Sequence, residues 1–360
     1  MKSKWEYKIG IVAVLIFLAV AIFFVKYVMH RKEVRDDRAP VTSYEVAVVE
    51  GSEQAVKSTI TYYDKDLKEV GKQNFPYGGL CGSVEPVFYG DKVYLVPDGG
   101  QKTLSDIVLE IDVKTGTQKE YHMPESGLWD MEVDAENIYF VNNQDGCVYS
   151  FNKRNSNVGR VKLADSDFCD ALALKDGILY AFGEETSCLY EIDVKTFSVV
   201  NKVDVSKYGE GVLGTCFYGE DLYIVFSQLG EDTELDYICS YSFATKKMRK
   251  IGLGVKEPLQ IKKHKGLLYI VHSDMHDQEN TSSSISIYNP KNGDLQNEML
   301  DRHISGIDFK NEKMFLYGNN TFAIYSEDKN HKFVLEKEKD VYTQKNNRCY
   351  YWVSGFFLKR

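Results

Sequence analysis

Acidic residues recur at similar places along the first half of the chain. Glu85, Asp130 and Asp170 each lie nine or ten residues before a tyrosine at the centre of an apolar segment. If these tyrosines mark one repeated unit, the three carboxylates face a common space. There they raise one another's pKa or bind a cation such as Ca²⁺. The alternative is that they are solvated turn residues of an acidic protein.

Two aromatic residues accompany these acids. Trp129 directly precedes Asp130, and Phe168 lies two residues before Asp170. An aromatic ring beside a carboxylate suits a sugar, an amine or a peptide side chain. The alternative is a hydrophobic plug at one end of the repeated structure. We therefore take Glu85, Trp129, Asp130, Phe168 and Asp170 as the candidate binding residues.

A further candidate for metal binding is the segment His272-Ser273-Asp274-Met275-His276. Its imidazole and carboxylate groups are common metal ligands, but the segment runs from a strand into a loop, so their convergence is not assured. A surface histidine pair is the alternative. No cofactor is predicted, although a structural or catalytic Ca²⁺ stays open. The weak metal candidates are Glu85, Asp130, Asp170, His272, Asp274 and His276.

No catalytic motif is found in the chain. The sequence has no GxSxG, HExxH or P-loop pattern, each of which would position a nucleophile, a metal or a phosphate. Residues 209–214 (GEGVLG) match GxGxxG, but they lead into a strand of the repeat rather than into a helix, so they are not a dinucleotide-binding fingerprint. We therefore assign no catalytic residue. The sequence leaves open whether the protein is an enzyme, and it favours a protein without catalytic activity.

The elements that would position these residues come from an internal repeat. A segment with a central aromatic residue recurs at spacings of 45, 41, 43, 46, 46 and 36 residues. A period near 43 with short strands and no helical periodicity is typical of a β-propeller, in which each sheet packs on its neighbours around an axis. The central aromatic residues are Tyr94, Tyr139, Tyr180, Tyr223, Tyr269, Phe315 and Tyr351.

The two ends of the chain together predict the closing blade. The C-terminal copy around Tyr351 would supply the inner strands, and Ser58–Asp64 and Leu67–Phe75 would supply the outer half. This count predicts an all-β, seven-bladed propeller closed by N- and C-terminal strands. Six or eight blades stay possible, because Tyr44–Val49 could be an additional strand.

The hairpin segments Ile111–Gly116 (IDVKTG) and Ile192–Thr196 (IDVKT) resemble the repeats of the YVTN/quinoprotein-like propellers. The resemblance covers roughly residues 55–360 and implies a rigid disc with a central channel. The tryptophan-docking motifs typical of quinoprotein dehydrogenase blades are missing, which argues against a quinone cofactor. Because such discs host lactonases, adhesins and docking platforms alike, the resemblance implies a fold and not a function.

One apolar segment precedes the repeats. Ile9–Val25 contains no charged residue, and with the residues up to Met29 it reaches about 20 residues, enough to cross a bilayer as a helix. A cleaved signal peptide is the alternative, but no small-residue cleavage pattern follows the segment. The predicted organisation is a flank (1–8), a transmembrane signal-anchor helix (9–29), a juxtamembrane linker (30–43) and the propeller (44–360).

The charge of the chain is unevenly distributed. Residues 1–40 carry eight Lys/Arg and four Asp/Glu, whereas the remainder carries 36 against 49 and is therefore strongly acidic. An acidic domain is a poor partner for nucleic acid, because phosphate contacts need a basic surface. Contact with the lipid bilayer should come from residues 9–29 alone. The seven cysteines are scattered without metal-site spacing, as expected for small buried side chains.

These observations favour a single-pass protein of the cell membrane with its propeller outside the cytoplasm. The propeller is interpreted as a binding module for a protein, peptide or glycan ligand on one face. The first alternative is a metal-assisted hydrolase of the lactonase kind, with carboxylates at the mouth of the channel. The second is an interaction scaffold that faces the cytoplasm, since a strict count of Lys and Arg on the two flanks of the apolar segment slightly favours a cytoplasmic C-terminus.

Overall fold

The computed structural model describes residues 20–22, 39–52, 57–80, 85–97, 106–142, 144–164, 168–228, 235–273, 283–318, 321–341 and 352–360. Residues 20–22 are helical. Within these ranges, no helix combines the length and the apolar character needed to cross a membrane. The predicted anchor, residues 9–29, lies outside the described residues except for 20–22.

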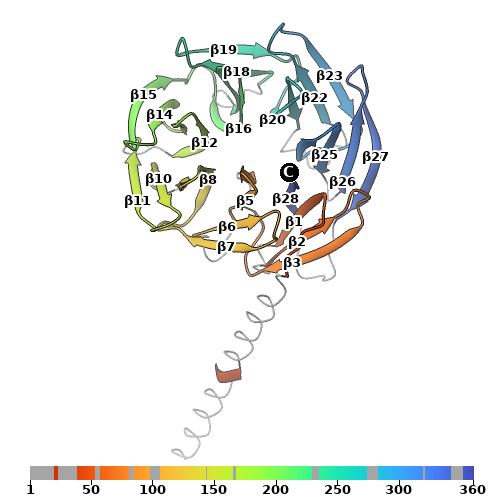
Figure 1. The fold of residues 1–360 in the computed structure, drawn as a ribbon. Helices are drawn as coiled ribbons and strands as arrows, with labels where there is room; N and C mark the ends of the chain where they lie inside the picture. The colour runs from red at the N-terminus through yellow and green to blue at the C-terminus, as the bar shows by residue number, and fades with distance from the viewer. Residues whose placement is uncertain are drawn as a thin grey trace, which may run out of the picture.

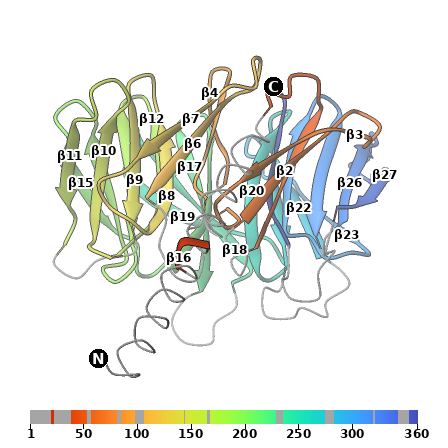
Figure 2. The ribbon, with the colours of Figure 1, turned by 90° about the horizontal axis from the view of Figure 1, so that it is seen from below.

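The described residues form seven four-stranded antiparallel sheets. Figure 1 shows these sheets arranged radially around one axis, and Figure 2 shows the resulting disc from the side. The strands of each blade are given below from the axis outward. The prediction of a seven-bladed all-β propeller is therefore confirmed.

Blade 1 consists of β4 (Val87–Tyr89), β5 (Lys92–Leu95), β6 (Ile107–Asp112) and β7 (Gln118–His122). Blade 2 consists of β8 (Leu128–Val133), β9 (Asn137–Asn142), β10 (Cys147–Asn152) and β11 (Val158–Lys162). Blade 3 consists of β12 (Cys169–Lys175), β13 (Ile178–Gly183), β14 (Cys188–Asp193) and β15 (Ser198–Asp204). Blade 4 consists of β16 (Glu210–Tyr218), β17 (Asp221–Gln228), β18 (Tyr237–Ser242) and β19 (Lys247–Gly252).

Blade 5 consists of β20 (Pro258–His264), β21 (Leu267–His272), β22 (Ser283–Tyr288) and β23 (Leu295–Leu300). Blade 6 consists of β24 (Gly306–Lys310), β25 (Lys313–Gly318), β26 (Thr321–Glu327) and β27 (Phe333–Asp340). Blade 7 consists of β28 (Trp352–Leu358), β1 (Val46–Ser52), β2 (Lys57–Tyr63) and β3 (Glu69–Phe75).

In blades 1 to 6 the repeat aromatics lie on the second strand, whereas Tyr351 lies outside the described residues. Tyr94, Tyr139, Tyr223 and Tyr269 are fully buried, because a second strand is covered on both faces by the neighbouring blades. A strand buried on both faces is apolar along its whole length rather than alternating, which explains the continuous apolar segments in the sequence. The repeated tyrosines are therefore core residues that hold blade against blade.

The closing blade differs in detail from the prediction. The C-terminus supplies only the innermost strand β28, and the N-terminus supplies the three strands β1, β2 and β3. The segment Tyr44–Val49 is therefore no additional strand, since most of it belongs to β1 as the second strand of blade 7. The physical reason is burial: Val46, Ala47 and Val48 are completely buried, which only a strand with cover on both faces allows.

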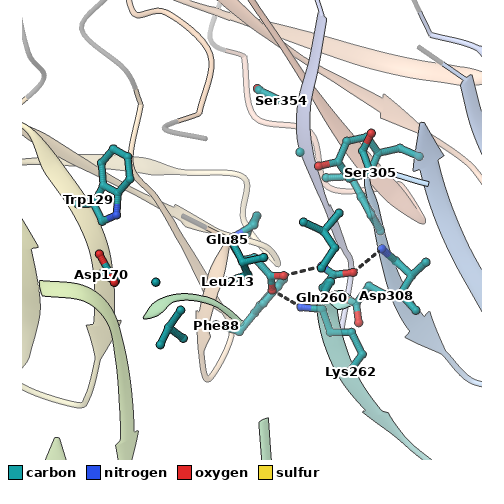
Figure 3. A pocket seen from close by; sticks show the side chains of 18 of the residues that line it. Glu85, Phe88, Trp129, Asp170, Leu213, Gln260, Lys262, Ser305, Asp308 and Ser354 are labelled. Carbon is teal, nitrogen blue, oxygen red and sulfur yellow. Dashed lines mark hydrogen bonds and ion pairs between the residues drawn. The ribbon is translucent and has the colours of Figure 1, made fainter. Parts of the chain in front are cut away.

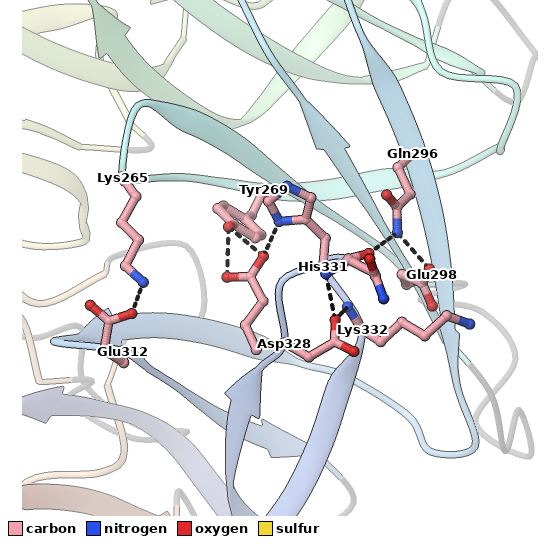
Figure 4. A network of polar contacts seen from close by, with 10 residues as sticks. Lys265, Tyr269, Gln296, Glu298, Glu312, Asp328, His331 and Lys332 are labelled. Carbon is pink, nitrogen blue, oxygen red and sulfur yellow. Dashed lines mark hydrogen bonds and ion pairs between the residues drawn. The ribbon is translucent and has the colours of Figure 1, made fainter.

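Polar contacts also join neighbouring blades. Between blades 5 and 6, the Tyr269 hydroxyl donates to the Glu327 carboxylate at 2.9 Å, and His331 Nδ1 lies 2.5 Å from the same carboxylate (Figure 4). Nearer the surface, Lys265 pairs with Glu312. A buried hydroxyl needs a partner, so the contact with Glu327 lets Tyr269 keep its polar end inside the core.

The described cysteines fit the expectation of small buried side chains. All five are free thiols, four of them are buried, and the fifth is partly buried. Cys81 and Cys349 lie outside the described residues. The described cysteines are Cys147, Cys169, Cys188, Cys216 and Cys239.

Candidate functional site

The centre of the disc contains a cavity of about 730 Å³, called here the mouth cavity. Every blade contributes a lining residue, from Glu85 before β4 to Ser354 on β28. A second cavity of about 530 Å³, the inner cavity, is lined by positions farther along β8, β12 and β16. The two cavities share Glu85, Asp170 and Leu213 in their walls, so they are consecutive parts of one channel.

β-Bulges direct side chains into the mouth cavity. In five of the seven blades, the innermost strand has one extra residue near its beginning relative to its neighbour. A bulge turns a side chain away from the regular alternation of the strand and is common beside functional sites. Figure 3 shows several of these side chains around the cavity. All five bulge residues line the mouth cavity: Trp129, Asp170, Leu213, Leu259 and Ser354.

A polar bridge crosses the channel from blade 1 to blade 5 (Figure 3). The Glu85 carboxylate pairs with Lys262 and accepts a hydrogen bond from Gln260 Nε2 at 2.5 Å. Gln260 Oε1 in turn accepts the backbone N–H of Ile307 in blade 6 at 2.7 Å. Burial alone would raise the pKa of Glu85, but the Lys262 ammonium outweighs this effect and holds the pKa below its usual range. Glu85 is therefore ionised at neutral pH.

Two other carboxyl groups follow one another along β8. Asp130 accepts the backbone N–H groups of Met131 and of Leu172 on β12, both at 2.7 Å. Glu132, two residues later, receives hydrogen bonds from the backbone of Val133 and Leu174. Burial raises the pKa of Asp130 to about 7 and that of Glu132 to about 8. Both groups therefore exchange protons near neutral pH.

The structure brings all five predicted binding residues to the channel. Glu85, Trp129, Phe168 and Asp170 line the mouth cavity, and Asp130 lines the inner cavity. Asp170, however, is not equivalent to the other two acids, because it is a bulge residue like Trp129. Glu85 and Asp130 have different partners, and within the described ranges the three carboxylates do not form one group that could hold a metal ion.

A constant offset from the repeat tyrosine would have found more of the site. The bulge residues of blades 2 to 5 lie ten residues before Tyr139, Tyr180, Tyr223 and Tyr269. This offset yields Leu213 and Leu259, which the search for acidic residues passes over. An offset of nine yields Gln260 along with Asp130, and an offset of seven yields Glu132 and Lys262.

His272, the first residue of the histidine segment, lies in the protein core. His272 is 3% exposed, and its ring nitrogens lie 2.8 Å from the Lys256 carbonyl oxygen and 2.7 Å from Ser286 Oγ. Burial lowers the pKa of His272 to about 4, so it is a neutral core residue. Asp274 and His276 lie outside the described residues. Within the described ranges, no three His, Cys, Asp or Glu side chains are grouped so that they could hold a metal ion.

Comparison with known proteins supports the fold. No family model and no curated protein matches the sequence. Among solved structures, a putative 6-phosphogluconolactonase from Bacteroides fragilis superposes with a TM-score of 0.58 at 12% identity, over 84% of this chain and 97% of that one. The designed protein Ika8 gives 0.55 at 12% identity, over 88% of this chain and 93% of that one.

A chain of the mitotic checkpoint complex is also similar. Its TM-score is 0.55 at 10% identity, over 71% of this chain and 77% of that one. A designed protein, a checkpoint component and a protein described as a lactonase thus share one architecture with this chain. At such identities the likeness extends to the fold alone. The resemblance to the YVTN/quinoprotein repeats stays a prediction.

Proposed function

We propose that this protein is a membrane-anchored propeller that binds a ligand in its mouth cavity, on the outer side of the cell membrane. The observation that supports binding is the cavity itself, whose volume of about 730 Å³ falls in the range of small-molecule sites. Bulge residues of five blades line its wall, and they combine apolar, aromatic and acidic side chains. Such a space can hold a small molecule, one side chain of a protein or peptide, or one sugar residue of a glycan.

Thermal-shift measurements on the full chain in mild detergent test this proposal. The probes are fragments of different charge and polarity, because a ligand that binds only the folded protein raises its melting temperature. The variant Leu213→Trp fills the cavity and should abolish the shift, whereas Val200→Trp on the exposed face of β15 should leave it unchanged. If no fragment binds, or if Leu213→Trp binds as well as the wild type, the proposal of a mouth-cavity site is wrong.

Attachment to the membrane rests on the apolar segment 9–29, and the outer location rests on the lysine-rich flank before it. Protease treatment of intact cells tests both. An outer propeller should be cleaved from whole cells while a cytoplasmic marker survives, and a variant without residues 9–29 should leave the membrane fraction. Cleavage only after lysis would favour the scaffold that faces the cytoplasm.

A second candidate is a hydrolase of the lactonase kind. It is favoured by Asp130 and Glu132, whose pKa values of about 7 and about 8 suit general acid–base catalysis. The shared fold with the Bacteroides fragilis protein is compatible with this activity. Hydrolysis of gluconolactone and of its 6-phosphate, followed by proton release, tests it. Activity that disappears in Asp130→Asn and Glu132→Gln would favour the enzyme over the binding module.

A further inference from the structure

We infer that the ligand carries a cationic ammonium group, which binds against the wall that blades 2 and 3 form in the mouth cavity. This inference rests on the proposed function and specifies the chemistry of its ligand. The wall consists of Trp129 on β8, Phe168 and Asp170 at the start of β12, and Glu184 after β13.

The backbone fixes the geometry of this wall. Trp129 and Asp170 are the bulge residues of neighbouring innermost strands, and Figure 3 shows the Asp170 carboxyl beside the indole ring. The Glu184 backbone N–H donates to the Phe168 carbonyl at 2.8 Å, which ties the β13–β14 turn to the start of β12. Two rings and two carboxylates thus lie on one side of the cavity, Trp129 and Asp170 on strands and Phe168 and Glu184 next to the ends of strands.

The basic groups of the mouth cavity are engaged elsewhere. Among the described lining residues, the only basic side chains are Lys262 and Arg360. Lys262 pairs with Glu85, and the Arg360 guanidinium lies 4.1 Å from the centre of the Phe88 ring. Neither belongs to blade 2 or 3. Among the described residues, the wall therefore carries two carboxylates and no basic side chain, which favours a cation over an anion.

Aromatic faces and carboxylates act together on one kind of ligand. Trp129 is 36% exposed, whereas the repeat tyrosines behind it are buried, so its ring is available to a bound group. An ammonium group is attracted to the face of an indole ring and to a nearby carboxylate, and both attractions strengthen when water is excluded. A neutral ligand of the same shape gains only the apolar contact.

Pairs of probes that differ only in charge test the inference on the full chain. Choline is compared with 3,3-dimethylbutan-1-ol, and benzylamine with benzyl alcohol, by calorimetry in low salt. Acetyl-lysine methylamide distinguishes a lysine side chain of a protein from a free amine. We expect each cation to bind at least about tenfold more tightly than its neutral partner. Asp170→Asn should remove most of this preference, whereas Asp170→Glu, which keeps the carboxylate, should retain it.

Control variants and the pattern of probe binding distinguish failure of the inference from failure of the proposed function. Trp129→Phe should retain binding better than Trp129→Leu, and Glu312→Gln on the outer surface should change nothing. Equal affinity for charged and neutral probes, or an unchanged preference in Asp170→Asn, would overturn the inference. If neutral or anionic fragments bind and Leu213→Trp blocks them, the binding cavity stands and only its preference for a cation is wrong. If no probe binds at all, the proposed function fails as well.

Discussion

Glu85 and Asp130 occupy the same repeat position in adjacent blades, yet their electrostatic environments are opposite. Each lies nine residues before the tyrosine of its second strand, and each faces the channel. Lys262 and Gln260 reach Glu85 from the far side of the channel and lower its pKa. Among the described residues, the groups that act on Asp130 are two backbone N–H groups and the Glu85 carboxylate, so burial prevails and raises its pKa to about 7.

The difference shows that the opposing strand, rather than residue type or position, determines the charge of a channel carboxyl. Backbone N–H groups stabilise a carboxylate, but here they do not offset its loss of hydration. An ammonium group in direct contact does, even though 177 residues separate the two partners in the chain. Three predictions test this contrast, beginning with the largest expected effect.

The double variant Asp130→Asn, Glu132→Gln should change the pH dependence of stability. Because folding raises both pKa values, the folded protein holds protons that the unfolded chain loses above about pH 4, and wild-type stability falls as the pH rises towards 8. The free energy of unfolding of the variant should lack this fall. Relative to the wild type, it should therefore increase by roughly 2 kcal/mol from pH 5 to pH 8, which is less than the full pKa shifts imply because the cavity admits water. Urea unfolding at four pH values measures it, and equal slopes in both proteins would contradict it.

Lys262→Met should lower stability at pH 7 and act in the opposite pH direction. The pKa of Glu85 is lowered on folding, so its contribution is present above its ordinary pKa and disappears on acidification. Since the Glu85 side chain is 49% exposed within the channel, we expect a loss of about 1 kcal/mol. In a double-mutant cycle with Glu85→Gln, the two losses should not add. Simple additivity would show that the two residues are not coupled.

The smallest effect is expected at the pair between Lys265 and Glu312 on the outer surface. Glu312 is 77% exposed, and exposed pairs contribute little because water and salt screen them. Glu312→Gln should therefore leave the melting temperature unchanged within about 2 °C at every pH and salt concentration. A loss as large as that of Lys262→Met would mean that crossing the channel gives the Glu85–Lys262 pair no advantage.

The sequence predicts the propeller well because its signal is local. Blades 1 to 6 each contain an aromatic residue between apolar neighbours on the second strand, and a period near 43 needs no knowledge of long-range contacts. The closing blade was harder, since a strand such as β1 is recognisable only by the cover that it receives from both neighbours. The prediction correctly joined both ends of the chain but divided the four strands wrongly between them.

The candidate site was predictable only in part. Acids and aromatics at a repeated position identify Trp129 and Asp170, because the repeat itself brings those positions together. The partner of Glu85 could not be found in this way, since Lys262 has no special local context and acts only across the axis. Bulges were equally hidden: one extra residue moves Asp170 out of step with Asp130, which the spacing in the sequence shows only when every blade is counted from its tyrosine.

The pairing of β1 with β28 has a consequence for how the protein is made. Val46 pairs with Leu358, so one edge of β1 stays open while the intervening residues emerge from the ribosome. An open strand edge invites pairing with other chains, and contacts between such distant residues form slowly. Nascent chains are therefore exposed to aggregation until β28 has been synthesised. We expect a chaperone that shields this edge until β28 emerges to raise the yield of folded protein.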